Sequence, residues 1–167
     1  MAIFEPFFQA LNYADLRYVV VGGLATVLHG HARLTVDIDL MVDLAPDHAE
    51  KVIATLTKLG LAPQLPVNPT DFANSQIRQA WNEEKSMQVL SMIDPANPLR
   101  VVDLFVKHPI PFEDLWARSK VINVGSTSIR IASLSDLIHL KRLAGRPQDL
   151  ADLEKLEQIQ QLQEGDN

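Results

Sequence analysis

The chain has no cysteine, which excludes disulfide bonds and metal sites built on thiolates. Aromatic residues make up only 6% of its 167 residues, and no apolar run is long enough to cross a membrane. Positive charge is scarce as well, because 15 Lys and Arg are outnumbered by 21 Asp and Glu and leave a net charge of −6. That balance argues against non-specific coating of nucleic acid, although one local basic patch would be enough for an RNA substrate.

The start of the chain and the missing cysteines both bear on the cellular compartment. Residues 1–16 contain neither the basic start nor the small-residue cleavage site of a signal peptide. We therefore expect a cytoplasmic protein without membrane contact. The length suits a single domain over residues 1–167, with a core over residues 16–131 and C-terminal helices over residues 133–163.

Helical and strand patterns alternate along the chain, which predicts an α/β (α+β) fold. Apolar and β-branched runs predict strands over residues 18–21, 36–42, 87–93, 99–106, 121–124 and 128–131. Apolar residues at helical spacing predict helices over residues 3–14, 24–29, 46–59, 71–84, 111–118 and 134–143, and from Pro147 onward. The expected buried stripes are Ile3, Phe7, Phe8 and Leu11 in the first helix and Leu150, Leu153, Leu156, Ile159 and Leu162 in the last.

Two aspartates lie inside a predicted apolar strand, in the sequence Asp37-Ile38-Asp39-Leu40. Side chains alternate faces along a strand, so the two carboxylates point the same way, with α-carbons roughly 6.5 Å apart. Flexible carboxylates at that separation can converge on one or two cations. A solvent-facing strand would also carry polar residues on one face, so these two residues alone leave a metal site and a solvated strand equally open.

Gly22 and Gly23 separate the strand over residues 18–21 from the helix that follows it. Glycine permits positive φ and lets a ligand approach the backbone closely, and free N–H groups at a helix start favour phosphate. A glycine pair can also serve a tight turn for steric reasons alone, so the informative feature is the combination with Asp37 and Asp39. A dinucleotide-binding motif is disfavoured, because Thr26 stands where its third glycine would be.

The pattern hydrophobic-Gly-Gly, about a dozen residues, then Asp-hydrophobic-Asp-hydrophobic resembles the motif of the polymerase-β-like nucleotidyltransferases. Residues 21–42 are especially similar to small bacterial nucleotidyltransferases of the abortive-infection and toxin type. The matching positions of their Arg-x-Thr-x-Asp-hydrophobic-Asp motif are Arg33, Thr35, Asp37 and Asp39. Residues 140–156 resemble the Lys-rich C-terminal motif of that group. The resemblance implies a small mixed β-sheet flanked by helices, with a helical C-terminus.

The resemblance also implies a third carboxylate on a neighbouring strand, and Asp103 matches it best by position and apolar context. The alternative for Asp103 is an ion pair with Arg100 or Lys107. Asp43 and Asp94 match less well, because each lies where a strand gives way to a turn.

The implied reaction is transfer of NMP from an NTP to an acceptor hydroxyl. Two Mg²⁺ or Mn²⁺ ions about 3.5–4 Å apart can hold the attacking and leaving oxygens, and the resemblance assigns Asp37, Asp39 and Asp103 as their ligands. Asp103 would complete the acceptor-side metal or accept the hydroxyl proton. Gly22 and Gly23 would cradle the phosphates of the NTP.

Basic residues would neutralise the triphosphate. Lys141, in the Lys-rich stretch, is the expected catalytic phosphate contact, with its stem along the edge of the core and its ammonium exposed. Further nucleotide-binding candidates are Arg33, Thr35 and Arg146. A solvated helix face is the alternative for each basic residue. Asp149 and Asp152 match acidic positions of the same motif, or serve as ordinary partners of a helix N-terminus.

Two classes of function remain open. The first is an active nucleotidyltransferase whose acceptor is an RNA such as tRNA, a protein or a small molecule; a toxin-type enzyme with a cognate antitoxin protein is one form of it. The second is a catalytically degenerate member that binds nucleotide or a partner without turnover. The three strand aspartates Asp37, Asp39 and Asp103 favour the first, because a chain released from catalysis has little physical reason to keep three carboxylates in strands.

Overall fold

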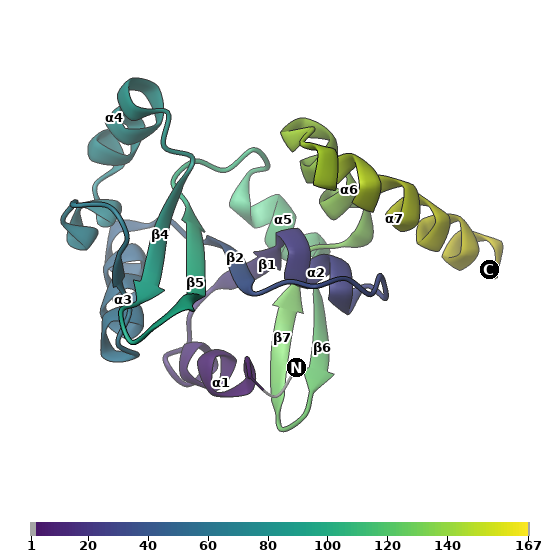
Figure 1. Ribbon diagram of the computed structural model, residues 1–167, viewed down its shortest axis with the longest axis horizontal. Helices are drawn as coiled ribbons and strands as arrows, with labels where there is room; N and C mark the ends of the chain where they lie inside the picture. The colour runs from purple at the N-terminus through teal and green to yellow at the C-terminus, as the bar shows by residue number, and fades with distance from the viewer. Residues whose placement is uncertain (1–2, 167) are drawn as a thin grey trace.

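The computed structural model describes residues 3–166, which form a seven-stranded mixed sheet with helices around it (Figure 1). The strands are β1 (Tyr18–Val21), β2 (Asp37–Val42), β3 (Ala62–Pro63), β4 (Val89–Asp94), β5 (Asn97–Phe105), β6 (Lys120–Val124) and β7 (Thr127–Ile131). The helices are α1 (Glu5–Tyr13), α2 (Gly22–Leu28), α3 (Pro46–Lys58), the 3-10 helix η1 (Pro69–Ala73), α4 (Ser75–Lys85), α5 (Phe112–Arg118), α6 (Leu134–Ala144) and α7 (Pro147–Gly165). The predicted mixed α/β fold with a helical C-terminus is confirmed.

The strand order across the sheet is β3-β4-β5-β2-β1-β7-β6. The central strand β2 runs antiparallel to β1 and parallel to β5, and β4 runs antiparallel to β5. This register places Val21, Asp39, Asp103 and Ser91 in one row across four neighbouring strands. Residues paired in this way project from the same face of a sheet, so Asp39, Asp103 and Ser91 share one face.

The opposite face of the same strands is apolar. Ile38, Leu40, Val102 and Leu104 are all at most 3% exposed and belong to the main core. Alternation along β2 and β5 therefore places the carboxylates on one face and the core contacts on the other, as the sequence pattern predicts. This core burial fixes the strand register, because a shift by one residue would turn both aspartates into the core.

Three helical predictions need correction. Helix α2 begins at Gly22 and not at residue 24, so the glycine pair forms its first turn. The helix predicted over residues 71–84 is η1 followed by α4, because the Asn74 side chain accepts hydrogen bonds from the N–H groups of Gln76 and Ile77 and starts a new helix. Ile3 precedes α1 and is 79% exposed.

Only part of the predicted apolar stripe of the last helix is buried. Leu153 and Leu156 are buried, but Leu150 and Leu162 are 57% and 70% exposed. Helix α7 contacts α6 as far along as Glu157 and Gln160 and then runs away from the sheet (Figure 1), so Leu162 near its end has little to pack against. Within the described part of the chain, none of the helices combines the length and the apolar character needed to cross a lipid bilayer.

Candidate active site

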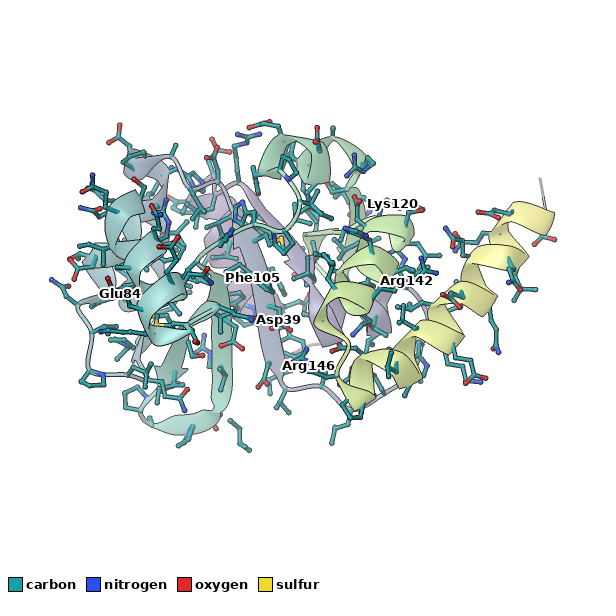
Figure 2. All side chains as sticks on the ribbon, turned by 90° about the horizontal axis from the view of Figure 1, so that it is seen from above. Asp39, Glu84, Phe105, Lys120, Arg142 and Arg146 are labelled. Carbon is teal, nitrogen blue, oxygen red and sulfur yellow. The ribbon has the colours of Figure 1, made fainter. Side chains whose placement is uncertain are left out.

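Three carboxylates lie on the polar face of two neighbouring strands. Asp39 on β2 is the direct partner of Asp103 on β5, and strands in a sheet are about 4.8 Å apart. Asp37 lies two residues before Asp39 and projects from the same face. Asp37 is exposed, whereas Asp39 and Asp103 are half-buried. Figure 2 shows Asp39 on the sheet between α4, which carries Glu84, and the α6–α7 pair, which carries Arg142.

The electrostatics of these carboxylates disfavour their charged forms. Burial raises the pKa of Asp39 to about 6, and the charges of Asp103 and Asp37 act in the same direction. Burial likewise raises the pKa of Asp103; the hydrogen bond from Ser91 opposes this shift and the charge of Asp37 adds to it. Like charges gathered in a half-buried site are stabilised by a bound cation, and such perturbed groups are typical of functional sites.

Ser91 holds the third carboxylate in place. Its Oγ donates a hydrogen bond of 2.5 Å to Oδ1 of Asp103. The alternative ion pair of Asp103 with Arg100 or Lys107 is wrong, because Arg100 lies instead 3.5 Å from Asp94. Ser91 was not among the predicted site residues, since only the pairing of β4 with β5 brings it beside Asp103, and no sequence spacing reveals that register.

The glycine pair lies directly against the carboxylates. Gly22 has φ +65°, and a Cβ at this position would overlap the carboxylate of Asp39. A Cβ at Gly23 would lie 2.7 Å from Oγ1 of Thr35 and 3.6 Å from Cζ of Arg33. The first turn of α2 can therefore contact all three of these side chains because Gly22 and Gly23 have no side chains. The structure brings together the glycines, Thr35, Arg33 and Asp39 that the sequence motif selects.

Lys141 is buried, although the sequence predicted an exposed ammonium group. The residue is only 4% exposed, and its Nζ donates to Asp152 Oδ2 at 2.8 Å and to Asp149 Oδ1 at 3.3 Å. The prediction of an exposed ammonium is wrong, because α7 folds back after Gly145 and covers the lysine with both aspartates. Lys141 is thus the centre of a buried ion-pair network between α6 and α7.

Two arginines connect this network to its surroundings. Arg33 Nη1 lies 2.5 Å from Asp152 Oδ2, and Arg146 Nε lies 2.7 Å from Asp149 Oδ2. The hydrogen bond to Asp149 raises the pKa of Arg146, and the charges of Asp39 and Asp103 raise it further. The Arg146 side chain is 76% exposed and its charge interacts with those of Asp39 and Asp103, so Arg146 is an accessible cation near the carboxylates (Figure 2).

The donor set suits a divalent cation of the Mg²⁺ type, which prefers carboxylate oxygens and water. Among residues 3–166, no three His, Cys, Asp or Glu side chains are already gathered around one metal position. Asp103 accepts a hydrogen bond from Ser91 and Asp37 is exposed to solvent, so gathering the three carboxylates around one ion would require side-chain rotation. Asp37, Asp39 and Asp103 are the residues that would hold the ion, and the missing side chain at Gly22 leaves the space beside Asp39 open.

Two solved structures are similar to this fold over almost their whole length. The lincosamide antibiotic adenylyltransferase LnuA, in a lincomycin-bound crystal structure, is 16% identical, with a TM-score of 0.62 over 93% of this chain and 95% of that chain. The Thermotoga maritima protein TM1012, described as a candidate nucleotidyltransferase, is 15% identical, with a TM-score of 0.59 over 92% of this chain and 89% of that chain. Such low identities show a shared fold and leave the substrate open.

A search of curated protein sequences finds no significant match to the chain. A family model does match it, over residues 1–164, and its family is described as "Nucleotidyltransferase of unknown function (DUF6036)". The match includes the glycine pair, the three carboxylates and the ion-pair network of α6 and α7. The chain therefore belongs to this nucleotidyltransferase family.

Proposed function

We propose that the protein transfers NMP from an NTP to a hydroxyl group of an acceptor, with Mg²⁺ or Mn²⁺ bound by Asp37, Asp39 and Asp103. The main observation behind this proposal is the close approach of Gly22 to Asp39, which is paired with Asp103 on the neighbouring strand. A phosphate chain can approach bare backbone at that point and lie beside carboxylates suited to metal ions. Divalent ions, when bound, would neutralise the charge on the transferred phosphoryl group and its leaving group.

The other residues have separate tasks in this reaction. The acceptor oxygen forms a bond to the α-phosphorus, and the bond from that phosphorus to pyrophosphate breaks. Ser91 holds Oδ1 of Asp103, so Asp103 Oδ2 either ligates the acceptor-side ion, with the hydroxyl proton passing to water, or accepts that proton itself. Arg146 binds the triphosphate. Lys141 acts indirectly, by fixing the two aspartates that orient Arg146 and Arg33.

The acceptor has two candidates. The resemblance to toxin-type enzymes favours an RNA such as tRNA, modified in the cytoplasm by an enzyme whose activity a cognate antitoxin protein would restrain. A small-molecule hydroxyl is the second candidate. It is favoured by the similarity to an adenylyltransferase that was crystallised with lincomycin, which extends over 93% of this chain.

Transfer of a radiolabel tests the proposal and separates the acceptors. The protein is incubated with each α-labelled NTP, Mg²⁺ and either total RNA or a panel of hydroxyl-bearing small molecules. We expect label on a discrete RNA band; label on a small molecule would retain the enzyme and replace the acceptor. The variant Asp37→Asn/Asp39→Asn is the control and should transfer none. Nucleotide binding without transfer to any acceptor would contradict the proposal in favour of a degenerate binding protein.

Metal binding can be measured without turnover. We expect Mn²⁺ to bind the wild-type protein in isothermal titration calorimetry and not to bind Asp37→Asn/Asp39→Asn. The double variant should remain folded, because both side chains lie on the polar face of β2 and removal of like charges relieves repulsion. Equal Mn²⁺ affinity in the two proteins would show that the carboxylates are not the metal ligands.

A further inference from the structure

A polar cavity lies between α4 and the segment that follows β5. Its volume is about 390 Å³, which is within the size range of small-molecule sites. Its polar lining includes Arg78, Gln79 and Asn82 from α4, and Lys107 and His108 from the chain after β5. None of these residues belongs to the carboxylate site, so the cavity has no role in the proposed transfer reaction.

Arg78 is a buried charge in the wall of this cavity. The residue is only 7% exposed, and burial lowers its pKa. Its guanidinium donates a hydrogen bond to the Phe72 carbonyl and lies 5.7 Å from the centre of the Phe72 ring. No carboxylate within residues 3–166 forms an ion pair with it. A guanidinium has five N–H donors, so most of its capacity to bind an anion is unused, and a buried charge without a counter-ion is costly.

His108 adds a second unsatisfied group to the same wall. Its Nε2 is buried and has no hydrogen-bond partner among the described residues. Burial and the nearby charge of Arg78 lower the pKa of His108 to about 4, so the imidazole is neutral at physiological pH. A neutral imidazole can donate one N–H. The ring is held by Phe112, with ring centres 5.7 Å apart, so its direction is fixed by packing.

The remaining charges around the cavity also favour an anion. Lys107 is exposed at the rim. The acidic residue in the lining, Glu83, already accepts a hydrogen bond of 3.0 Å from Gln79 Nε2 on the same exposed face of α4. With His108 neutral, two permanent positive charges in the lining face one negative charge there, and the more buried of the positive charges lacks a partner. Asp43, outside the lining, also acts on His108, but Arg17 forms an ion pair with it.

We propose that this cavity binds a small molecule through an oxyanion group, a carboxylate or a phosphate, held by Arg78 and His108. The planar fork of an arginine binds two oxygens of either group at once, and the N–H of His108 supplies a further donor. Lys107 attracts the anion from the rim as a solvated charge. A bound oxyanion would supply the partner that both buried groups lack.

NMR of the imidazole nitrogens tests the proposal directly. The chain has five histidines, and a long-range ¹H–¹⁵N spectrum separates their ring signals. The full chain is titrated with inorganic phosphate in one series and acetate in another. We expect a saturable shift of the His108 Nε2 signal in at least one series. A tighter response to phosphate would assign a phosphate-bearing ligand, and a tighter response to acetate would assign a carboxylate.

Variants separate the cavity from the carboxylate site. Arg78→Met should weaken the response at least about tenfold, the equivalent of about 1.4 kcal/mol, whereas Arg142→Met should not change it. Arg146→Met should leave the His108 response unchanged, since Arg146 belongs to the other site. If Arg78→Met does not fold, the exposed Lys107→Gln provides a second test, with an expected weakening of about two- to fivefold from loss of a solvated charge.

Three results would overturn the proposal: a His108 signal that responds to neither anion, a response retained in full by Arg78→Met, or, where that variant does not fold, no effect of Lys107→Gln. Because these readouts require neither NTP nor acceptor, they remain informative even if the chain proves to have no transferase activity.

Discussion

Of the two glycines in the candidate site, Gly22 has less room for a side chain. Its φ of +65° alone disfavours a side chain, and a Cβ would also overlap the Asp39 carboxylate. Gly60 has φ +85° with nothing within 4 Å of the place a Cβ would occupy, so Gly60→Ala measures the backbone cost alone, about 1–2 kcal/mol. We expect Gly22→Ala to cost more stability in urea unfolding and to abolish NTP binding, while Gly60→Ala still binds NTP. Equal behaviour of the two variants would show that the contact with Asp39 is unimportant.

Ser91 is expected to position a catalytic group without touching the nucleotide. A hydrogen bond to a charged group is worth about 1.5–3 kcal/mol, so Ser91→Ala should lower kcat at least about tenfold. The Kd for NTP should change little, because Ser91 lies beyond Asp103 from the glycine pair. Ser91→Thr keeps the hydroxyl and should restore much of the rate. A loss of kcat in Ser91→Thr as large as that in Ser91→Ala would contradict this role.

At the scale of elements, the α6–α7 pair depends on Lys141. Removal of one partner from a buried ion pair costs about 3–5 kcal/mol. We expect Lys141→Met near the lower end of that range, since Asp152 keeps Arg33 and Asp149 keeps Arg146. The next residue, Arg142, is an exposed partner of Glu157, and Arg142→Met should cost less than about 1 kcal/mol. Urea unfolding of the two variants measures the difference, and equal costs would show that the buried network does not stabilise the pair.

The sequence predicts the elements well where local pattern decides them. Alternation along residues 37–40 places Asp37 and Asp39 on one face, and the turn at Gly125-Ser126 joins β6 and β7 as a hairpin. The errors arise where distant segments meet. The burial of Lys141 depends on how α7 turns back onto α6, and the contact between Arg33 and Asp152 joins residues 119 positions apart. Local spacing contains no information about such contacts.

At the scale of the whole molecule, the buried network makes stability sensitive to acid. Burial alone would raise the pKa of Asp149 and Asp152; the hydrogen bonds and charges of Arg146, Lys141 and Arg33 outweigh it, and both pKa values are lowered. A lowered pKa in the folded state contributes stability that is present above the unfolded value of about 3.9 and is lost as pH falls through the folded value. Below about pH 4, we therefore expect the free energy of unfolding to decrease.

Urea unfolding at a series of pH values checks this prediction. Asp149→Asn/Asp152→Asn should be less stable than the wild type at neutral pH, and the difference should shrink as the pH falls below about 4. A difference that stays constant across the acidic range would show that these two carboxylates do not contribute to the acid sensitivity. Asp43 also has a lowered pKa, but it belongs to a separate ion pair with Arg17, which the double variant leaves intact.

The two sides of the carboxylate site come from opposite ends of the chain. The glycines and aspartates belong to residues 22–103, whereas Arg146 and the aspartates that hold it belong to residues 146–152, near the C-terminus. During synthesis, residues 22–103 leave the ribosome before residues 146–152, because the chain is made from its N-terminus. A nascent chain would therefore carry the carboxylates without their arginine. The site becomes complete only after α7 has been made and has folded back onto α6, so any transfer activity begins with that late step.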